Sequence, residues 1–506
     1  MKHSLLLATM ILSGLFTTDL SAQTKNTLNN DASPIAQRLI SGMAQNTKTL
    51  DAACLKYRTL RNNVASKSDS TEFRFLEVTS HGGDLDKQLG DDIYDVDSLV
   101  VKGQINDDDF TTLWLSTFYG RVSVINMEHA NVKRGVIPKK AFWKADHVNA
   151  NEGLIYIINL RRIIMPEGIK RIEEDAFSYA LKLEEINIPS TLQYVDGDAF
   201  YECVNLRTNP LAFPEGFAGI SGKAFYNCKA LTGKVELPST IKYIDSEAFY
   251  RSRISSINLP EGLTSIGDRA FSSSRLKEVD IPNSCQELGE GICELSQELE
   301  KIHLPEGLKR IPPRMANTCL KLREVYIPSS VKTIGEEAFQ GCQSIKKLEL
   351  PKGLETIEDG ALWSLESLEE IVFPATLKYL GARSCMFWTN IKRIYCMAPE
   401  PPKCEPSTLD GGYSPFGSFD SYSDETPRDI PVYVPVGSAD KYRMVIGWNY
   451  FDNFVETDNI PTAIQGVVAE PSKANGGIYD LAGRKVEKPQ KGNVYVVNGK
   501  KVMIGR

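Results

Sequence analysis

A pattern of apolar and polar positions returns every 22 to 25 residues through the middle of the chain. Each unit alternates apolar and polar residues and ends on a proline, as in INIP, VELP and IHLP. A unit this short cannot bury its own apolar face, so the units must stack, and the period predicts a solenoid. The repeat prolines are Pro166, Pro189, Pro214, Pro238, Pro260, Pro282, Pro305, Pro328, Pro351 and Pro374, preceded less regularly by Pro138.

Each unit, called a coil here and named by its proline, predicts a strand followed by a turn. Apolar Val325 and Ile327 alternate with Glu324 and Tyr326, which is the period of a strand with one buried face. The proline ends the strand because it has no N–H to donate, and Pro-Glu-Gly predicts a tight turn. A short extended stretch and a brief helical turn with an Ala-Phe pair then complete the coil. The Ala-Phe pairs stand at 176–177, 199–200, 224–225, 248–249, 270–271 and 338–339.

Stacking places like residues above like, so we expect a ladder of isoleucines, a ladder of phenylalanines and one continuous core. Coils whose strands pair lie about 4.8 Å apart, which predicts a long surface without an obvious pocket. Removal of one ladder phenylalanine should cost roughly 3–5 kcal/mol, as for other buried Phe→Ala changes.

From about residue 130 to 395 the repeat resembles that of BspA-like leucine-rich-repeat proteins, which are bacterial surface proteins. The resemblance rests on Leu-x-x-Ile-x-Ile-Pro followed by Leu-x-x-Ile, Ala-Phe and cysteine. It implies a β-rich α/β fold: a right-handed leucine-rich-repeat solenoid with a parallel concave sheet, an N-terminal helical cap and a small C-terminal β module. We expect locally irregular convex turns where the Ala-Phe pair is replaced. These departures are Ile292-Cys293, Met315-Ala316 after Pro312-Pro313, Ala361-Leu362 and Ser384-Cys385.

The chain divides into five predicted segments. Residues 1–22 have the basic start, apolar run and small-residue end of a signal peptide. Residues 23–130 are expected to form a helical cap with degenerate repeats, 131–395 the solenoid, and 396–457 a closing cap. In that cap the aromatic residues Trp448, Tyr450, Phe451 and Phe454 are expected to seal the core, with a carbohydrate platform as the alternative.

Residues 458–506 form a linker and a tail with two hairpin signals, at 482–483 and at Asn498-Gly499. The tail is similar to the C-terminal sorting domain of the type IX secretion system, which implies export to the outer surface of a Gram-negative bacterium. It is shorter than the usual domain, so a plain β tail remains the alternative.

Composition and charge restrict the classes of partner. The 506 residues carry a net charge of −7 and no basic run within the repeats, so we expect no nucleic acid partner. Beyond the signal peptide no apolar run is long enough for a transmembrane span. We expect a secreted monomer without cofactor or metal. The acidic groups at 91–97 and 107–109 lack the glycine and closing glutamate of a calcium loop, and are interpreted as a solvated turn and a helix start.

The cysteine positions argue for buried thiols. Cys203, Cys228, Cys319 and Cys342 each lie 14 residues after a repeat proline, so they should form ladder members whose Cβ vectors do not converge. One disulfide remains open, between Cys396 and Cys404 around a proline-rich segment.

Outward positions two and four residues before each proline form the candidate site. Tyr326, between rows of lysine and glutamate, is the expected contact centre because tyrosine is favoured at protein interfaces. The alternative is that these charges only solvate the sheet. The candidate ligand-binding residues are Glu278, Asp280, Lys301, His303, Glu324, Tyr326, Lys347 and Glu349.

We therefore expect a surface adhesin or recognition protein that binds an extracellular protein, and the family resemblance implies host matrix or plasma proteins. A carbohydrate-binding surface protein is the first alternative and predicts exposed aromatic residues along one face. An enzyme with its site in a terminal module is the second, although His81, His129, His147 and His303 lie far apart and outside any catalytic motif.

Overall fold

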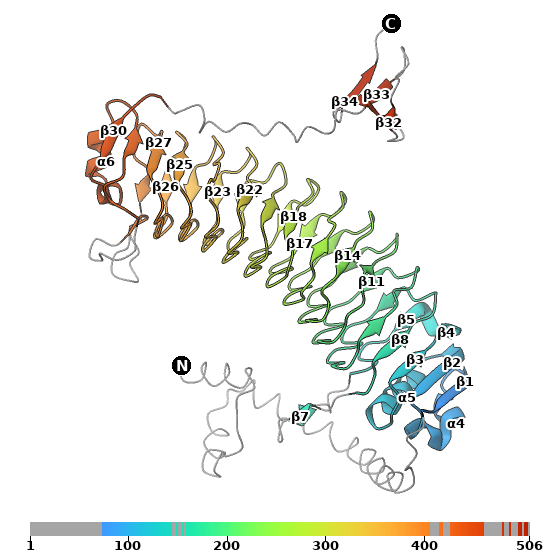
Figure 1. The fold of residues 1–506 in the computed structure, drawn as a ribbon. Coiled ribbons are helices and arrows are strands. Elements are labelled where there is room, and N and C mark those ends of the chain that lie inside the picture. Colours follow the sequence, from blue (N-terminus) through green and yellow to red (C-terminus); the bar gives the residue numbers. More distant parts are fainter. Residues whose placement is uncertain are drawn as a thin grey trace, which may run out of the picture. The chain divides into compact units, whose positions relative to one another are not determined.

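The structure is a computed structural model, and it confirms a solenoid of parallel strands (Figure 1). The predicted signal peptide and the helical spacing expected before residue 73 lie outside the described residues. The described residues are 73–143, 148–149, 154–155, 158–404, 414–417, 426–459 and four short C-terminal strands.

An N-terminal module leads into the repeats. Its parallel strands β1 (Phe75–His81), β2 (Ser98–Ile105) and β3 (Val124–Asn126) pair in chain order. The next strand in this sheet is β8 (Arg162–Ile164), so the module and the repeats share one sheet. Its remaining elements are α4 (Leu85–Leu89), η1 (Gly90–Tyr94), α5 (Asp107–Phe118), β4 (Ala130–Val132) and η2 (Lys133–Gly135), before the antiparallel pair β6 (Val148–Asn149) and β7 (Leu154–Ile155).

The strands before the repeat prolines form the first ladder, as predicted, except that the residues before Pro351 make only an isolated bridge. Paired strands are parallel with like positions opposite each other, and the ladder is interrupted between residues 186 and 211, between 257 and 278, and between 326 and 370. The strands after β8 are β10 (Glu185–Ile186), β12 (Leu211–Ala212), β14 (Lys234–Glu236), β16 (Ser256–Ile257), β18 (Glu278–Asp280), β20 (Lys301–His303), β22 (Glu324–Tyr326), β25 (Glu370–Phe373) and β27 (Arg393–Cys396).

The short extended stretch after each proline forms a second parallel ladder. Most of its strands contribute one buried aliphatic residue, such as Ile172 or Ile244. The strands are β5 (Val136–Ile137), β9 (Arg171–Ile172), β11 (Tyr194–Val195), β13 (Gly219–Ile220), β15 (Tyr243–Ile244), β17 (Ser265–Ile266), β19 (Glu287–Leu288), β21 (Arg310–Ile311), β23 (Thr333–Ile334), β24 (Thr356–Ile357), β26 (Tyr379–Leu380) and β28 (Lys403–Cys404).

The segment with the Ala-Phe pair is not the helical turn that the sequence predicts. The residue before each alanine has a positive φ, as at Asp175 (59°) and Asp198 (56°), so the backbone cannot continue as a helix. The N–H of Phe177 instead donates to the carbonyl of Ala199 in the next coil, over 2.8 Å. Hydrogen bonds between coils therefore form a third ladder on this side of the solenoid.

One proline interrupts the second ladder. In the neighbouring coils the residue after each strand donates its N–H to a carbonyl one coil earlier. Gly289 donates to the carbonyl of Ile266 over 2.8 Å, and Gly335 donates to that of Ile311 over 3.0 Å. Pro312 holds that position in its coil and has no N–H, so β19 and β21 do not pair. The coils remain joined there by β18 and β20 and by the turn ladder.

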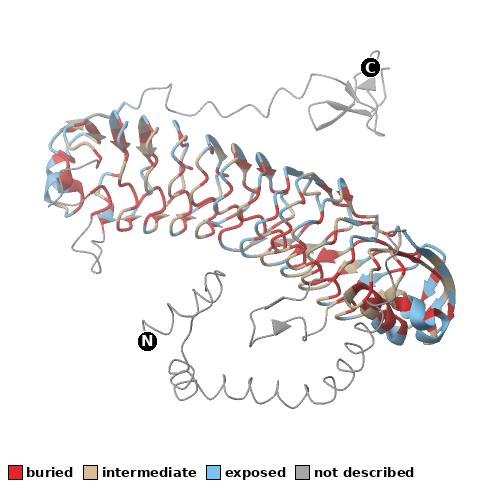
Figure 2. Ribbon diagram, turned by 60° about the horizontal axis from the view of Figure 1, so that its bottom comes forward, coloured by how far each residue is buried: buried red, intermediate tan, exposed pale blue. Residues whose placement is uncertain are grey.

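The core runs through all the coils, as Figure 2 shows by its continuous buried interior. The predicted phenylalanine ladder is confirmed: Phe177 and Phe200 stack at 5.0 Å, and Phe200 and Phe225 at 5.1 Å. The expectation of irregular turns is wrong for the Pro282 and Pro305 coils, because Ile292 and Met315 are buried and the turn ladder persists. In both coils a large apolar residue stands one position before the missing phenylalanine.

A closing module covers the far end. Its elements are β29 (Val432–Val434), α6 (Ala439–Met444), η4 (Trp448–Tyr450) and β30 (Phe454–Glu456), and β27, β29 and β30 extend the first ladder. The four aromatic residues predicted to seal the core are buried.

The predicted C-terminal hairpins are confirmed in the strands that are described. Strands β31 (Ile478–Tyr479) and β32 (Lys485–Val486) pair antiparallel, as do β33 (Val494–Val497) and β34 (Lys500–Met503).

Candidate functional site

Six of the eight candidate residues lie side by side on three consecutive strands. In the outer row, Glu278 of β18 lies opposite Lys301 of β20, which lies opposite Glu324 of β22. The inner row lies two residues before each proline. In it Asp280 lies opposite His303, which lies opposite Tyr326. Parallel pairing puts like positions on one face, so these six side chains form one surface, called the Tyr326 patch here.

Tyr326 is at the end of the patch and is one of its exposed large side chains, with 43% of the residue exposed. Its ring contacts the His303 ring edge to face, with centroids 4.3 Å apart. Its hydroxyl donates to Oε1 of Glu306 over 2.8 Å, and this hydrogen bond, with burial, raises the pKa of Tyr326. The tyrosine is therefore held in place by a neighbouring coil while its outer ring surface stays open to solvent.

Charged pairs surround the tyrosine. Lys301 Nζ lies 2.9 Å from Glu278, a bond that raises the pKa of Lys301, and His303 Nδ1 lies 3.2 Å from Asp280. These pairs are largely exposed, so each stabilises the fold little and remains available to a partner.

The last two candidate residues are not joined to the patch by strand pairing. Lys347 lies 2.8 Å from Glu349 in its own coil and forms a single bridge with Glu370 of the following coil. No register between β22 and residues 347–349 is present among the described residues.

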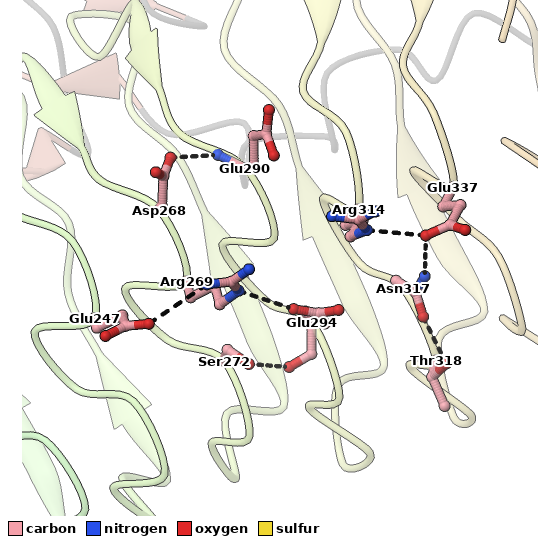
Figure 3. Close-up of polar contacts among 10 residues, drawn as sticks. All are labelled: Glu247, Asp268, Arg269, Ser272, Glu290, Glu294, Arg314, Asn317, Thr318 and Glu337. Carbon is pink, nitrogen blue, oxygen red and sulfur yellow. Dashed lines mark hydrogen bonds and ion pairs between the residues drawn. The ribbon is translucent and has the colours of Figure 1, made fainter. Parts of the chain in front are cut away.

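The turn side of the solenoid carries a row of charges that sequence analysis missed (Figure 3). Arg269 lies between Glu247 and Glu294, 3.4 Å from each, and Arg314 lies 2.9 Å from Glu337. These residues recur at fixed distances after successive prolines, which is the sequence signal that could have revealed them. The pairs join consecutive coils, and opposite charges neutralise one another within them.

A row of tyrosines also lies on the turn side. Tyr201 and Tyr226 stack at 4.7 Å, and Tyr226 and Tyr250 at 4.9 Å. All three are half-buried, and the Tyr226 ring is stacked between the other two.

Shallow hollows are present on the described surface, and two of them lie over the repeats. The larger, of about 580 Å³, lies over β15, β17 and β19, where Ser265, Gly267 and Gly289 leave room beside Tyr243 and Glu287. The smaller, of about 360 Å³, lies on the turn side beside Trp363. Among the described residues no group of three histidine, cysteine or acidic side chains is arranged to hold a metal ion.

The acidic segment at 107–109 is a helix start, as the sequence predicts, whereas the segment at 91–97 includes η1, and its Asp97 is largely buried and pairs with Arg121. Asp107, Asp108 and Asp109 form the first turn of α5, and the N-cap residue Asn106 completes a capping box with Asp109. Asp109 is buried and accepts from the backbone N–H groups of residue 83 and residue 85, which fixes α4 against α5.

All nine cysteines in the described residues are free and buried. Burial raises the pKa of Cys342 to about 12, so its thiol stays neutral. Cys396 and Cys404, left open as a disulfide by the sequence, lie on β27 and β28 in different ladders. The thiol of Cys396 accepts a hydrogen bond from Tyr442 instead, over 3.2 Å.

The described part of the chain has no helix with the length and apolar character needed to cross a bilayer. A family model described as the BspA type leucine rich repeat region matches in six copies, over residues 150–232, 205–323 and 309–399. No curated protein matches the chain.

Three solved structures are similar to the chain. A leucine-rich repeat protein from Bacteroides ovatus is 25% identical over 55% of this chain and 79% of that chain, with a TM-score of 0.38. A leucine rich cell surface protein from Faecalibacterium prausnitzii is 17% identical, with coverage of 65% and 88% and a TM-score of 0.30. The pneumococcal vaccine antigen PcpA is 17% identical, with coverage of 72% and 80% and a TM-score of 0.35.

Proposed function

The chain belongs to the BspA-type leucine-rich-repeat family, and from this premise we propose that it is an exported surface protein that binds a protein ligand through the Tyr326 patch. The family resemblance favours a host matrix or plasma protein as the ligand. The signal-peptide pattern of residues 1–22 and the hairpin tail support export to the outer surface.

The single observation that supports the patch is an exposed tyrosine among charged pairs on three adjacent strands. Tyrosine combines a large apolar ring with a hydroxyl, and its two rotatable bonds mean that little conformational entropy is lost on binding. Because Glu306 and His303 already hold the Tyr326 ring, binding loses less of that entropy than it would with a free side chain. Charges of both signs around the ring then select for a partner of complementary pattern.

The proposal is tested by measuring the binding of the purified chain to immobilised fibronectin, fibrinogen, laminin and collagen. We expect at least one of these proteins to bind. Tyr326→Ala should then weaken binding by roughly 2 kcal/mol or more, as for a central tyrosine in an interface. Lys301→Glu should weaken binding further, because it reverses a charge in the patch and replaces the ion pair with Glu278 by a repulsion between two carboxylates.

Two control variants separate the patch from general effects. Lys234→Glu makes the same charge change at the equivalent position of β14, where Lys234 pairs with Glu236 at 2.9 Å. Tyr326→Phe keeps the ring and removes only its bond to Glu306. Equal binding by the wild type and the Tyr326→Ala, Lys301→Glu double variant would show that the ligand binds elsewhere.

A further inference from the structure

The hollow beside Trp363 lies at a coil that lacks a side chain at one turn position. Three consecutive coils place Thr318, Gly341 and Ser364 at the same turn position, each with a positive φ of 58°, 70° and 59°. Only the middle coil has glycine there. A Cβ at Gly341 would lie 3.4 Å from Thr318, which is an ordinary van der Waals contact, so a side chain could be accommodated there. Gly341, with Thr318 and Ser364, lines a hollow of about 360 Å³.

An aromatic wall borders this hollow. Trp363 lies one coil beyond Gly341 and is half-buried, and Phe387 stacks against it from the next coil with centroids 6.1 Å apart. The guanidinium of Arg383 lies 5.4 Å from the Trp363 ring. In the tyrosine row Tyr226 has a stacked tyrosine ring on each side, whereas the Trp363 ring borders the hollow on the side of Gly341.

The polar groups around the hollow are neutral and already positioned. The Thr318 hydroxyl donates to Asn317 over 2.6 Å, a contact visible in Figure 3. The amide of Gln343 and the hydroxyl of Ser364 both donate to Oε1 of Glu366, over 2.7 and 3.1 Å. Amides and hydroxyls provide donors and acceptors together, and each keeps hydrogen-bonding capacity after these contacts.

We propose that this hollow binds a neutral hexose unit of a glycan. A pyranose ring presents an apolar C–H face, which suits the Trp363 ring, and hydroxyls, which suit amides and hydroxyls that can both donate and accept. The residues that line the hollow carry no charge, and the charges that contact them, on Arg383 and Glu366, are of opposite sign, so a neutral ligand suits the site. The volume lies within the usual range for a small-ligand site. This site is on the turn side and is separate from the Tyr326 patch, which lies on the first ladder.

The test measures the affinity of the full chain for four soluble neutral polysaccharides, namely laminarin, yeast mannan, starch and xyloglucan, by calorimetry. We expect one of them to bind. Trp363→Ala should weaken that binding roughly tenfold or more by removing the ring. Gly341→Asn should weaken it similarly by filling the hollow, since asparagine tolerates a positive φ and neighbouring coils carry side chains there.

Tyr226→Ala is the matched control, because it removes a half-buried aromatic residue from the equivalent turn position of another coil without a hollow. It should bind like the wild type, and thermal unfolding of all variants confirms that they fold. The proposal is overturned if none of the four polysaccharides binds, or if Trp363→Ala and Gly341→Asn bind as well as the wild type. Loss of a protein ligand in these two variants, with no glycan bound, would identify the hollow as part of a protein interface instead. Tyr326→Ala should leave glycan binding unchanged, so this test and that of the patch can fail independently.

Discussion

At the scale of single residues, the cysteines 14 positions after the repeat prolines act as hydrogen-bond donors as well as apolar fillers. The thiol of Cys203 lies 3.1 Å from the carbonyl of Phe177 one coil earlier, and Cys342 makes the same contact with Ala316. Ser296 and Trp388 occupy this position in other coils and donate to the equivalent carbonyl. A side-chain donor is thus common at this position, although Ala180 and Leu365 hold it without one.

We predict that Cys342→Ser is more stable than Cys342→Ala. Both side chains are small, but only serine replaces the donor to Ala316, and a net hydrogen bond is worth about 1 kcal/mol. In a purely apolar site the order would be reversed, because alanine is cheaper to bury than serine. Urea unfolding of the two variants measures the difference. An alanine variant as stable as the serine variant would show that the thiol acts only by filling space.

A second residue-scale prediction concerns Asp198, which has a positive φ of 56°. Burial, followed by repulsion from Asp175, raises the pKa of this carboxyl above its ordinary value of 3.8. The folded state thus binds the proton more tightly than the unfolded state, so this group's contribution to stability falls as the pH rises through the window above 3.8. Asp198→Asn removes the penalty and should raise the Tm at pH 7.

The same variant contains its own control. Asparagine also favours a positive φ, an effect that does not depend on pH. Any gain that persists below pH 3.8 is therefore conformational, and the additional gain at pH 7 measures the charge. A Tm difference that is constant across this range would contradict the assigned cause.

At the scale of elements, the strands could be predicted from the sequence but the turns could not. Alternation before each proline fixes the first ladder, because a half-buried strand needs only its own residues to be recognised. In the turn, Val195, Ala199, Phe200 and Cys203 are spaced as on one face of a helix, so the sequence does not distinguish this turn from a helical one. Their backbone N–H groups bond to the next coil, and a single coil carries no sign of that partner.

The candidate site was predictable to the same extent. Strand register places Glu278, Lys301 and Glu324 together, and the sequence contains that register. The bond from Tyr326 to Glu306 and the hollow at Gly341 depend on side chains from neighbouring coils, so they required the structure. The sequence signal for the hollow was Gly341, because the adjacent coils carry Thr318 and Ser364 at the same turn position.

Coil spacing leads to a prediction about glycines without a positive φ. A Cβ on Gly267 would lie 2.3 Å from the backbone nitrogen of Ser246, and backbone cannot move aside. Gly267→Ala should therefore destabilise the fold by about 1–3 kcal/mol, as overpacking does. Gly353→Ala is the control, because only the flexible end of Lys332 lies within 3 Å there. Thermal unfolding compares the two, and an equal effect would mean that the coils separate to accommodate the methyl group.

At the scale of the solenoid, breaks in the two strand ladders fall at different coil boundaries. The first ladder is interrupted between β10 and β12, between β16 and β18 and between β22 and β25, and the second between β19 and β21. At each of these boundaries the other strand ladder and the turn ladder continue. The core is thus never cut, but the Pro282 coil has a break in a different ladder on each side, so it is held by fewer strand hydrogen bonds than the coils directly before and after it. Because stability in a solenoid is a sum over neighbouring coils, this coil is expected to be a weak junction.

Hydrogen exchange of two opposed variants tests this junction. Phe225→Ala removes a stacked ring on the N-terminal side and should cost roughly 3–5 kcal/mol, as should Phe339→Ala on the C-terminal side. If the Pro282 coil separates two cooperative units, Phe225→Ala lowers the protection of backbone amides against exchange in the coils before Pro282. It leaves the protection of the coils after Pro328 nearly unchanged. Phe339→Ala should do the reverse. Uniform loss of protection along all coils in both variants would show that two ladders hold the junction as firmly as three, and that the solenoid unfolds as one unit.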